Sequence, residues 1–96
     1  MATIIEVTQP QFRNEIRVYP VDFTDDLLTG ITVTSAIVTH TPPSGSGSVA
    51  GTATASPIVN VTFGTVAVVG THYLDTLATL SDGEKSAVRL IVYVPR

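Results

Sequence analysis

The stretch LDTLATLSDGEKSAVRLIVYV, residues 74–94, decides the fold of this chain. It holds two β-patterned runs, Leu74–Leu80 and Ala87–Val94, joined by Ser81-Asp82-Gly83-Glu84, whose Asp-Gly pair can take the positive φ angles of a tight turn. The stretch therefore predicts an antiparallel hairpin. The alternation predicts one buried face, made of His72, Leu74, Ala78, Leu80, Val88, Leu90, Val92 and Val94. The other face is predicted to meet solvent or a partner, and holds Tyr73, Asp75, Thr79, Arg89 and Tyr93.

The residues before this hairpin repeat the same pattern of short apolar runs. Valine, threonine and isoleucine contribute 14, 15 and 7 of the 96 residues, and these β-branched side chains favour strands over helices. Further strands are expected at residues 2–7, 15–23, 31–40 and 57–63. The pattern predicts an all-β fold, an antiparallel Ig-like β-sandwich of about seven strands, with an open barrel as the alternative. The length predicts a single domain over residues 1–96.

Two strands carry irregularities that predict their place in the sheets. Pro20 has no N–H to donate, so the strand at residues 15–23 is expected at a sheet edge or at a bulge. In the strand at residues 31–40, Ile31, Val33 and Ile37 share one phase and are predicted to be buried. That alternation is imperfect around Ser35-Ala36, which indicates a bulge there.

Two segments are predicted to lie outside the sandwich core. Residues 41–56 contain a Pro-Pro pair and a Ser/Gly repeat, a composition that predicts a flexible loop. Residues 1–9 are predicted to act as a docking arm, because a short terminal strand can add to the sheet of a neighbour.

The sequence offers few candidates for metal binding or catalysis. Asp22, Asp25 and Asp26 are weak candidates for a calcium ion, but an acidic turn whose carboxylates cap backbone N–H groups is the preferred interpretation. His40, His72 and Asp75 could supply parts of a hydrolase triad, yet the chain has no Gly-x-Ser-x-Gly motif. We therefore predict a protein that is not an enzyme and needs no metal or cofactor.

Composition excludes several classes of partner. A net charge of -3 with 14% charged residues gives no basic surface for nucleic acid, so none is expected as a partner. No apolar run is long enough to cross a bilayer, no secretory signal is recognisable, and cysteine is absent. Synthesis in a cytosol, no membrane partner and a weakly charged surface that contacts neighbouring subunits are the expectations.

The stretch VYPVDFTDDLLTGITVTSA, residues 18–36, together with Gly70-Thr71-His72-Tyr73, resembles small Ig-like phage virion proteins. The shared features are a Val-Asp-aromatic strand, an acidic turn, a Gly-started strand and a late Gly-Thr-x-Tyr strand. The resemblance covers roughly residues 16–94, and the longer segment after Pro42 departs from it. It implies a location in the virion, after synthesis in the host cytoplasm, and a role in capsid decoration or as a fibre-tail adaptor. It implies no catalytic residues.

Two functions follow as expectations. The first is a non-enzymatic structural protein of a phage particle, a homo- or hetero-oligomer that assembles on capsid or tail subunits. Its expected partner-binding residues lie on the docking arm and on the strand that contains Pro20, and they are Thr3, Ile5, Val7, Tyr19 and Pro20. The alternative is a receptor- or glycan-binding module in which the loops at residues 22–30 and 41–55 form one recognition end of the sandwich.

Overall fold

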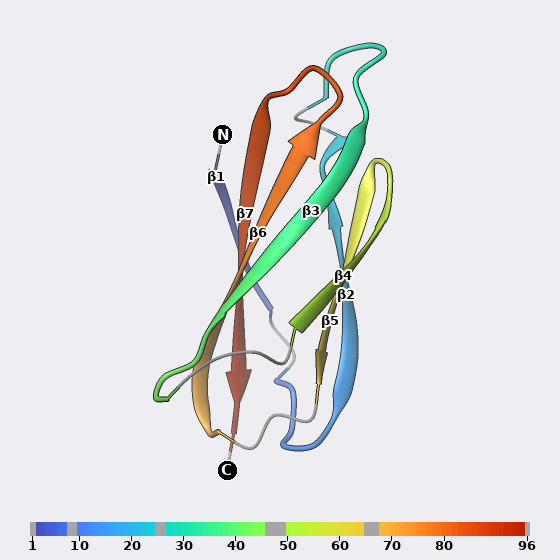
Figure 1. Cartoon of the computed structure of the whole chain (residues 1–96). Coiled ribbons are helices and arrows are strands. Elements are labelled where there is room, and N and C mark those ends of the chain that lie inside the picture. The colour runs from blue at the N-terminus through green and yellow to red at the C-terminus, as the bar shows by residue number, and fades with distance from the viewer. Residues whose placement is uncertain (1, 8–9, 25–26, 46–49, 65–67, 96) are drawn as a thin grey trace.

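The computed structural model describes residues 2–7, 10–24, 27–45, 50–64 and 68–95. These residues form seven strands in two facing sheets, as predicted (Figure 1). The strands are β1 (Ala2–Glu6), β2 (Ile16–Asp22), β3 (Val33–Thr41), β4 (Ala50–Ala55), β5 (Ile58–Gly64), β6 (Gly70–Leu80) and β7 (Lys85–Val94). The all-β sandwich expected from the sequence is therefore confirmed.

The two sheets have an immunoglobulin-like strand order. Sheet A is ordered β1-β7-β6-β3, and sheet B is ordered β2-β5-β4. Strands two, four and five thus share one sheet while three, six and seven share the other, as in constant-type immunoglobulin domains. The first strand differs, because it lies in sheet A, where it pairs parallel with β7. The other described pairings are antiparallel.

The core lies between the sheets and comes from alternate residues of the central strands. β5 contributes Val59, Val61 and Phe63, each with no exposed surface. The remaining buried apolar residues are Val21, Phe23, Val33, Leu74, Ala78, Leu80, Val88, Leu90, Val92 and Val94. Because the buried face of β6 and β7 matches the predicted set, including His72, the alternation in residues 72–94 located the core correctly.

The β6–β7 hairpin is present, with a turn that differs from the expected one. Gly83 has a φ of 91°, whereas Asp82 is not among the residues with positive φ. The Gly83 N–H donates to the Leu80 carbonyl (3.0 Å), and the Leu80 N–H donates to the Glu84 carbonyl (2.8 Å). A single left-handed glycine after a tight turn is the geometry of a three-residue hairpin loop, so only the glycine needs positive φ.

The bulge predicted in β3 reverses the phase of that strand. The register against β6 shifts between Val33 and Ser35. Val33 is buried as expected, but Ile37 after the shift is 68% exposed, so the prediction that Ile37 is buried was wrong. Val38 packs against the core in its place, because one extra residue moves every later side chain to the other face.

The segment predicted as a loop at residues 41–56 contains a strand. Residues 50–55 form β4 and pair with β5 from Ala50 opposite Phe63 to Ala55 opposite Ile58. The prediction of a loop across this range was therefore wrong for β4. The strand could not be recognised from the sequence, because AGTATA has no large apolar side chain to indicate a buried face.

Candidate assembly interface

The two lateral sides of the sandwich differ. On one side, the edge strand of sheet A, β3, contacts the edge strand of sheet B, β4. The Thr52 hydroxyl donates to the Ala36 carbonyl across this junction (3.1 Å). We call this the closed side. The opposite ends of the two sheets are β1 and β2, and we call that side the open side. Among the described strands, nothing pairs with the outer edge of either β1 or β2.

The outer edge of β1 carries unused backbone groups at alternate residues. The Val7 N–H donates to the Ile91 carbonyl (2.9 Å), so Val7 directs its backbone groups toward β7. Successive residues of a strand direct these groups to opposite edges, so those of Ile5 also face β7. The N–H and C=O groups of Ile4 and Glu6 therefore point outward, away from the sheet. Ile4 is also 67% exposed.

The outer edge of β2 is interrupted by Pro20. The Phe23 N–H donates to the Pro57 carbonyl (3.0 Å) in the same register that pairs β2 with β5. By alternation, Tyr19 and Val21 also face β5, while Val18 and Pro20 face outward. The missing N–H of Pro20 thus lies on the solvent edge, where it breaks no bond within the sheet. The prediction that Pro20 marks an edge strand is confirmed.

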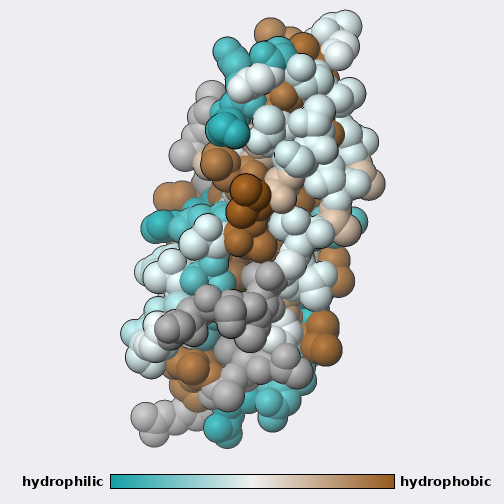
Figure 2. All heavy atoms as spheres, viewed as in Figure 1, coloured by the Kyte–Doolittle hydropathy of each residue, from teal (hydrophilic) through white to brown (hydrophobic). Residues whose placement is uncertain are grey.

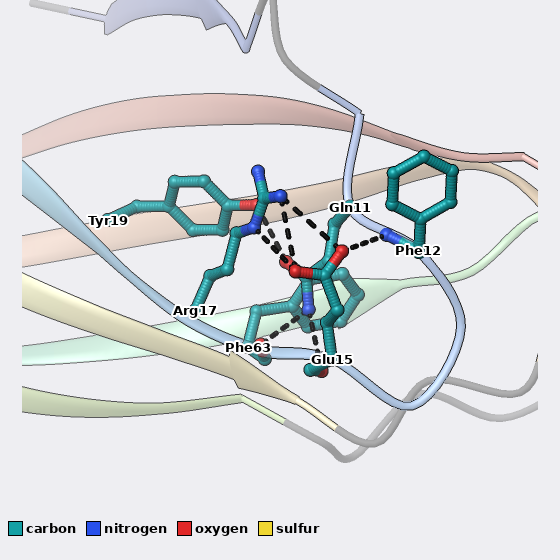
Figure 3. Close-up of polar contacts among 6 residues, drawn as sticks. All are labelled: Gln11, Phe12, Glu15, Arg17, Tyr19 and Phe63. Carbon is teal, nitrogen blue, oxygen red and sulfur yellow. Dashed lines mark hydrogen bonds and ion pairs between the residues drawn. The ribbon is translucent and has the colours of Figure 1, made fainter.

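Gln11 ties the two sheets together at one end of the open side (Figure 3). Its side chain is completely buried. Nε2 donates to the carbonyls of Phe63 (2.7 Å) and Glu15 (3.0 Å), and Oε1 accepts a hydrogen bond from the Tyr19 hydroxyl (2.6 Å). The Gln11 N–H donates to the Tyr93 carbonyl of β7 (3.1 Å). Each polar group of this amide is therefore used, and burial raises the pKa of Tyr19.

A turn beside Gln11 holds an ion pair. Asn14 has a φ of 67°, a conformation that asparagine tolerates well, and the Glu15 N–H closes the turn on the Phe12 carbonyl (3.2 Å). The Glu15 carboxylate accepts from the Phe12 N–H (2.7 Å) and pairs with Arg17 (3.2 Å). The Phe12 N–H, followed by Arg17, holds the pKa of Glu15 below its ordinary value. Glu15 and Arg17 therefore neutralise each other beside this turn.

The outward faces of the two sheets differ in charge. On sheet A, Arg89 pairs with Asp75 (2.7 Å) and lies 4.9 Å from the centre of the Tyr73 ring. On the described strands of sheet B, alternation places one charged side chain, Asp22, on the outer face. The other outward residues there are Ile16, Val18, Pro20, Gly51, Ala53, Ala55, Ile58, Asn60, Thr62 and Gly64. This face is a nearly neutral sheet surface next to the open side.

Sheet A also carries one exposed apolar pair. Ile37 and Leu77 lie opposite each other on β3 and β6 and are 68% and 39% exposed. Figure 2 shows an apolar group near the middle of the visible face, over β3 and β6, surrounded mostly by weakly polar side chains. The described part of the visible face around this pair is therefore mostly weakly polar.

The predicted partner-binding residues occupy the open side, but in unequal positions. Thr3 lies on β1. Ile5 is 39% exposed and Val7 packs against the core. Tyr19 points inward to Gln11, whereas Pro20 is exposed on β2. The sequence missed Ile4 and Glu6, because the direction of backbone groups depends on which strand β1 joins.

The acidic candidates for a metal do not form a described cluster. The Asp22 carboxylate accepts hydrogen bonds from the Thr24 N–H (2.9 Å) and from the Thr24 hydroxyl. The hydroxyl and then the N–H of Thr24 hold the pKa of Asp22 below its ordinary value. Asp25 and Asp26 lie outside the described residues. Asp22 thus acts as a cap of its turn.

The two histidines meet inside the sandwich, away from Asp75. His40 Nε2 lies 2.8 Å from His72 Nδ1, and His72 Nε2 lies 2.8 Å from the Val68 carbonyl. A carbonyl only accepts, so His72 donates from Nε2, and neutral His72 accepts at Nδ1 from His40. Asp75 is on the opposite face of β6, paired with Arg89. The sequence placed His72 in the core but could not predict its partner 32 residues away.

The two loops proposed as one recognition end begin at opposite ends of the molecule. One precedes β3 and the other follows it, and nine extended residues span about 30 Å. Figure 1 shows the loop before β3 near the β6–β7 turn and the segment after β3 at the other end. Hydrogen bonds between Thr32 and Ser81 connect the loop before β3 to the β6–β7 turn. Residues 42–45 therefore lie away from the first loop, whereas residues 50–55 run back toward it as β4, where Ala55 and Asp22 both lie opposite Ile58.

Comparisons with protein-family models, curated proteins and solved structures find no match to this chain. Within the described residues, no helix has the length and apolar character to cross a membrane. The surface features above are therefore the basis on which a function is proposed.

Proposed function

We propose that this protein is a non-enzymatic structural protein of a phage particle that assembles on capsid or tail subunits, as a decoration protein or a fibre-tail adaptor. The observation that carries the proposal is the open side, where two edge strands of facing sheets lack partners among the described residues. Unpaired edges add strands from other subunits, and natural monomers usually protect them.

The neutral outer face of sheet B supports contact with a large, flat partner. Ile16 and Val18 are 65% and 55% exposed and lie side by side along the same face. Gly64 is opposite Ile16, and the Ile16 side chain covers it. Depletion of charge is typical of the buried centre of protein interfaces. We assign docking on the particle to this face and to the adjoining edge of β2.

The small size of that face favours an assembly in many copies. Three short strands with spacings of about 4.8 Å present only a few hundred Å² to one partner, below the standard interface of roughly 800 Å² a side. A weak single contact becomes strong when many copies bind one particle. This fits a decoration protein or adaptor that binds the particle in many copies.

Gradient sedimentation tests the proposal. Particles are sedimented from lysates of cells that produce phage together with the tagged chain, and the particle fraction is probed for the tag. The wild-type chain should sediment with the particles. The tag signal of Val18→Glu in the particle fraction should be at least about tenfold lower, because docking would bury the new carboxylate. Leu28→Glu is the matched control, since Leu28 is 76% exposed but lies in the turn before β3.

Each result has a defined meaning. Wild-type protein that remains in the soluble fraction while particles sediment would contradict a virion role. Equal recovery of Val18→Glu and wild type would keep the virion role and reject the sheet B face as the docking surface.

A further inference from the structure

We propose that two copies of this chain pair through the outer edges of their β1 strands, antiparallel across a two-fold axis, to form one continuous sheet. The inference goes beyond the proposed function, because it concerns the purified chain alone. It uses β1, whereas docking on the particle is assigned to β2 and the outer face of sheet B.

β1 has few of the features that usually protect an edge strand. Such features are a very short strand, charged side chains, proline, bulges and inward-pointing charges; β1 has only its length of five residues and the charge of Glu6 at its end. β1 has the sequence ATIIE and pairs with β7 in unbroken register from Ala2 to Glu6. Its outward backbone groups belong to Ala2, Ile4 and Glu6, each of which has an N–H to donate. β2, in contrast, has lost one outward donor at Pro20.

The geometry of the sandwich gives a second copy room to approach. Sheet A has one strand more than sheet B, and the sheets meet at β3 and β4. β1 therefore extends past the edge of sheet B. The exposure of Ile5 agrees with this overhang, because its side chain is on the inner face and is still 39% exposed. A second β1 can align with the first without meeting β2.

The charges of β1 fit a copy of itself. Antiparallel pairing centred on Ile4 places Ile4 opposite its own counterpart and Glu6 opposite Ala2. The two Glu6 residues are then four positions apart along the strands, about 14 Å, beyond the Debye length at physiological salt. Cross-strand contact of two isoleucines stabilises the pair. The exposed surface of Ile4, 67% in the single chain, provides the apolar area that pairing removes from water.

Sedimentation equilibrium of the purified full chain tests the pairing. We expect a monomer of 10.1 kDa in dilute solution and a dimer as the concentration approaches about 1 mM, because the interface is short. Ile4→Lys places two ammonium groups opposite each other and should raise the dissociation constant about tenfold or more. Ile37→Lys is the matched control: it changes an isoleucine of equal exposure, 68%, on the other edge strand of sheet A, and should dimerise as wild type does.

A second variant separates pairing from folding. Glu6→Pro removes an outward N–H and leaves the donors that face β7 in place, so it should weaken the dimer while the circular dichroism spectrum is retained. A wild-type chain that stays monomeric up to about 1 mM would overturn the proposal. A dimer that survives Ile4→Lys and Glu6→Pro but is lost in Ile37→Lys would also overturn it, and would place the interface at the outer face of β3 and β6.

Discussion

The closed and open sides of this sandwich join the same two sheets by different means. On the closed side, β3 and β4 run next to each other, and the Thr52 hydroxyl spans the junction. On the open side, the outer edges of β1 and β2 have no partner among the described residues, and buried Gln11 connects the sheets at one end. The comparison shows that the two edge strands contact each other on the closed side, whereas on the open side one side chain connects the sheets and leaves backbone groups available.

Removing Gln11 should have the largest effect on stability. Gln11→Ala removes the acceptor of the Tyr19 hydroxyl and one donor to the Phe63 carbonyl, and it opens a cavity. We expect a loss of about 3 kcal/mol in the free energy of unfolding, measured by urea denaturation. A loss below about 0.5 kcal/mol would show that the amide does not hold the sheets together.

Gly64→Ala should come second, because it tests how Ile16 lies on the face beside the open side. A Cβ at Gly64 would lie 2.6 Å from Ile16 Cγ1, so we expect a loss of about 2 kcal/mol from overpacking. The double variant Gly64→Ala with Ile16→Ala should regain part of that loss in the same urea titration, because the Cγ atoms are removed while the Cβ of residue 16 stays 3.0 Å away. If the double variant is as unstable as Gly64→Ala alone, then Ile16 does not cover this glycine.

Thr52→Val should have a smaller effect, on the closed side. The variant removes one hydrogen bond to the Ala36 carbonyl, and the residue is exposed to water. We expect a loss of about 0.5–1 kcal/mol, because water can replace the hydroxyl. A loss equal to that of Gln11→Ala would contradict the comparison, since it would make a single side chain as important on the closed side as on the open one.

The histidine pair should make the free energy of unfolding depend on pH. The change in free energy should be smaller than the losses in the variants above. Burial, followed by the charge of His72, lowers the pKa of His40 from its ordinary value of 6.5. The unfolded chain then binds a proton at a higher pH than the folded one. Stability is therefore full above about pH 6.5 and is lost as the pH falls through that value. His40→Phe should make the urea midpoint less dependent on pH between about 7.5 and 5.5, and an unchanged dependence would assign the proton to another group.

The sequence predicted the positions of the strands far better than the surfaces on which the protein could contact a partner. Alternation in residues 59–63 and 72–94 identified the core because large apolar and polar residues alternate there. Ile37 was misplaced although the bulge before it was recognised, since a bulge has to be followed by a change of phase. β4 was missed because its alanines, threonines and glycine resemble a loop.

The candidate site was less predictable, for a physical reason. Pro20 revealed an edge strand through its missing donor, which is a local property. Gln11 contacts the carbonyl of Phe63, 52 residues away, and no local pattern marks such a partner. The parallel pairing of β1 with β7 decides that Ile4 and Glu6 face outward, and that pairing is a property of the fold.

Amide hydrogen exchange along β1 tests the central claim, an open edge on one side of the sandwich, most directly. In dilute protein, the amides of Ile5 and Val7 should be protected by β7 while those of Ile4 and Glu6 exchange rapidly. As the concentration rises and copies pair, Ile4 and Glu6 should become protected as well. Protection of all four amides in dilute protein would contradict the open edge, and rapid exchange of Ile4 and Glu6 at every concentration would contradict the pairing of copies.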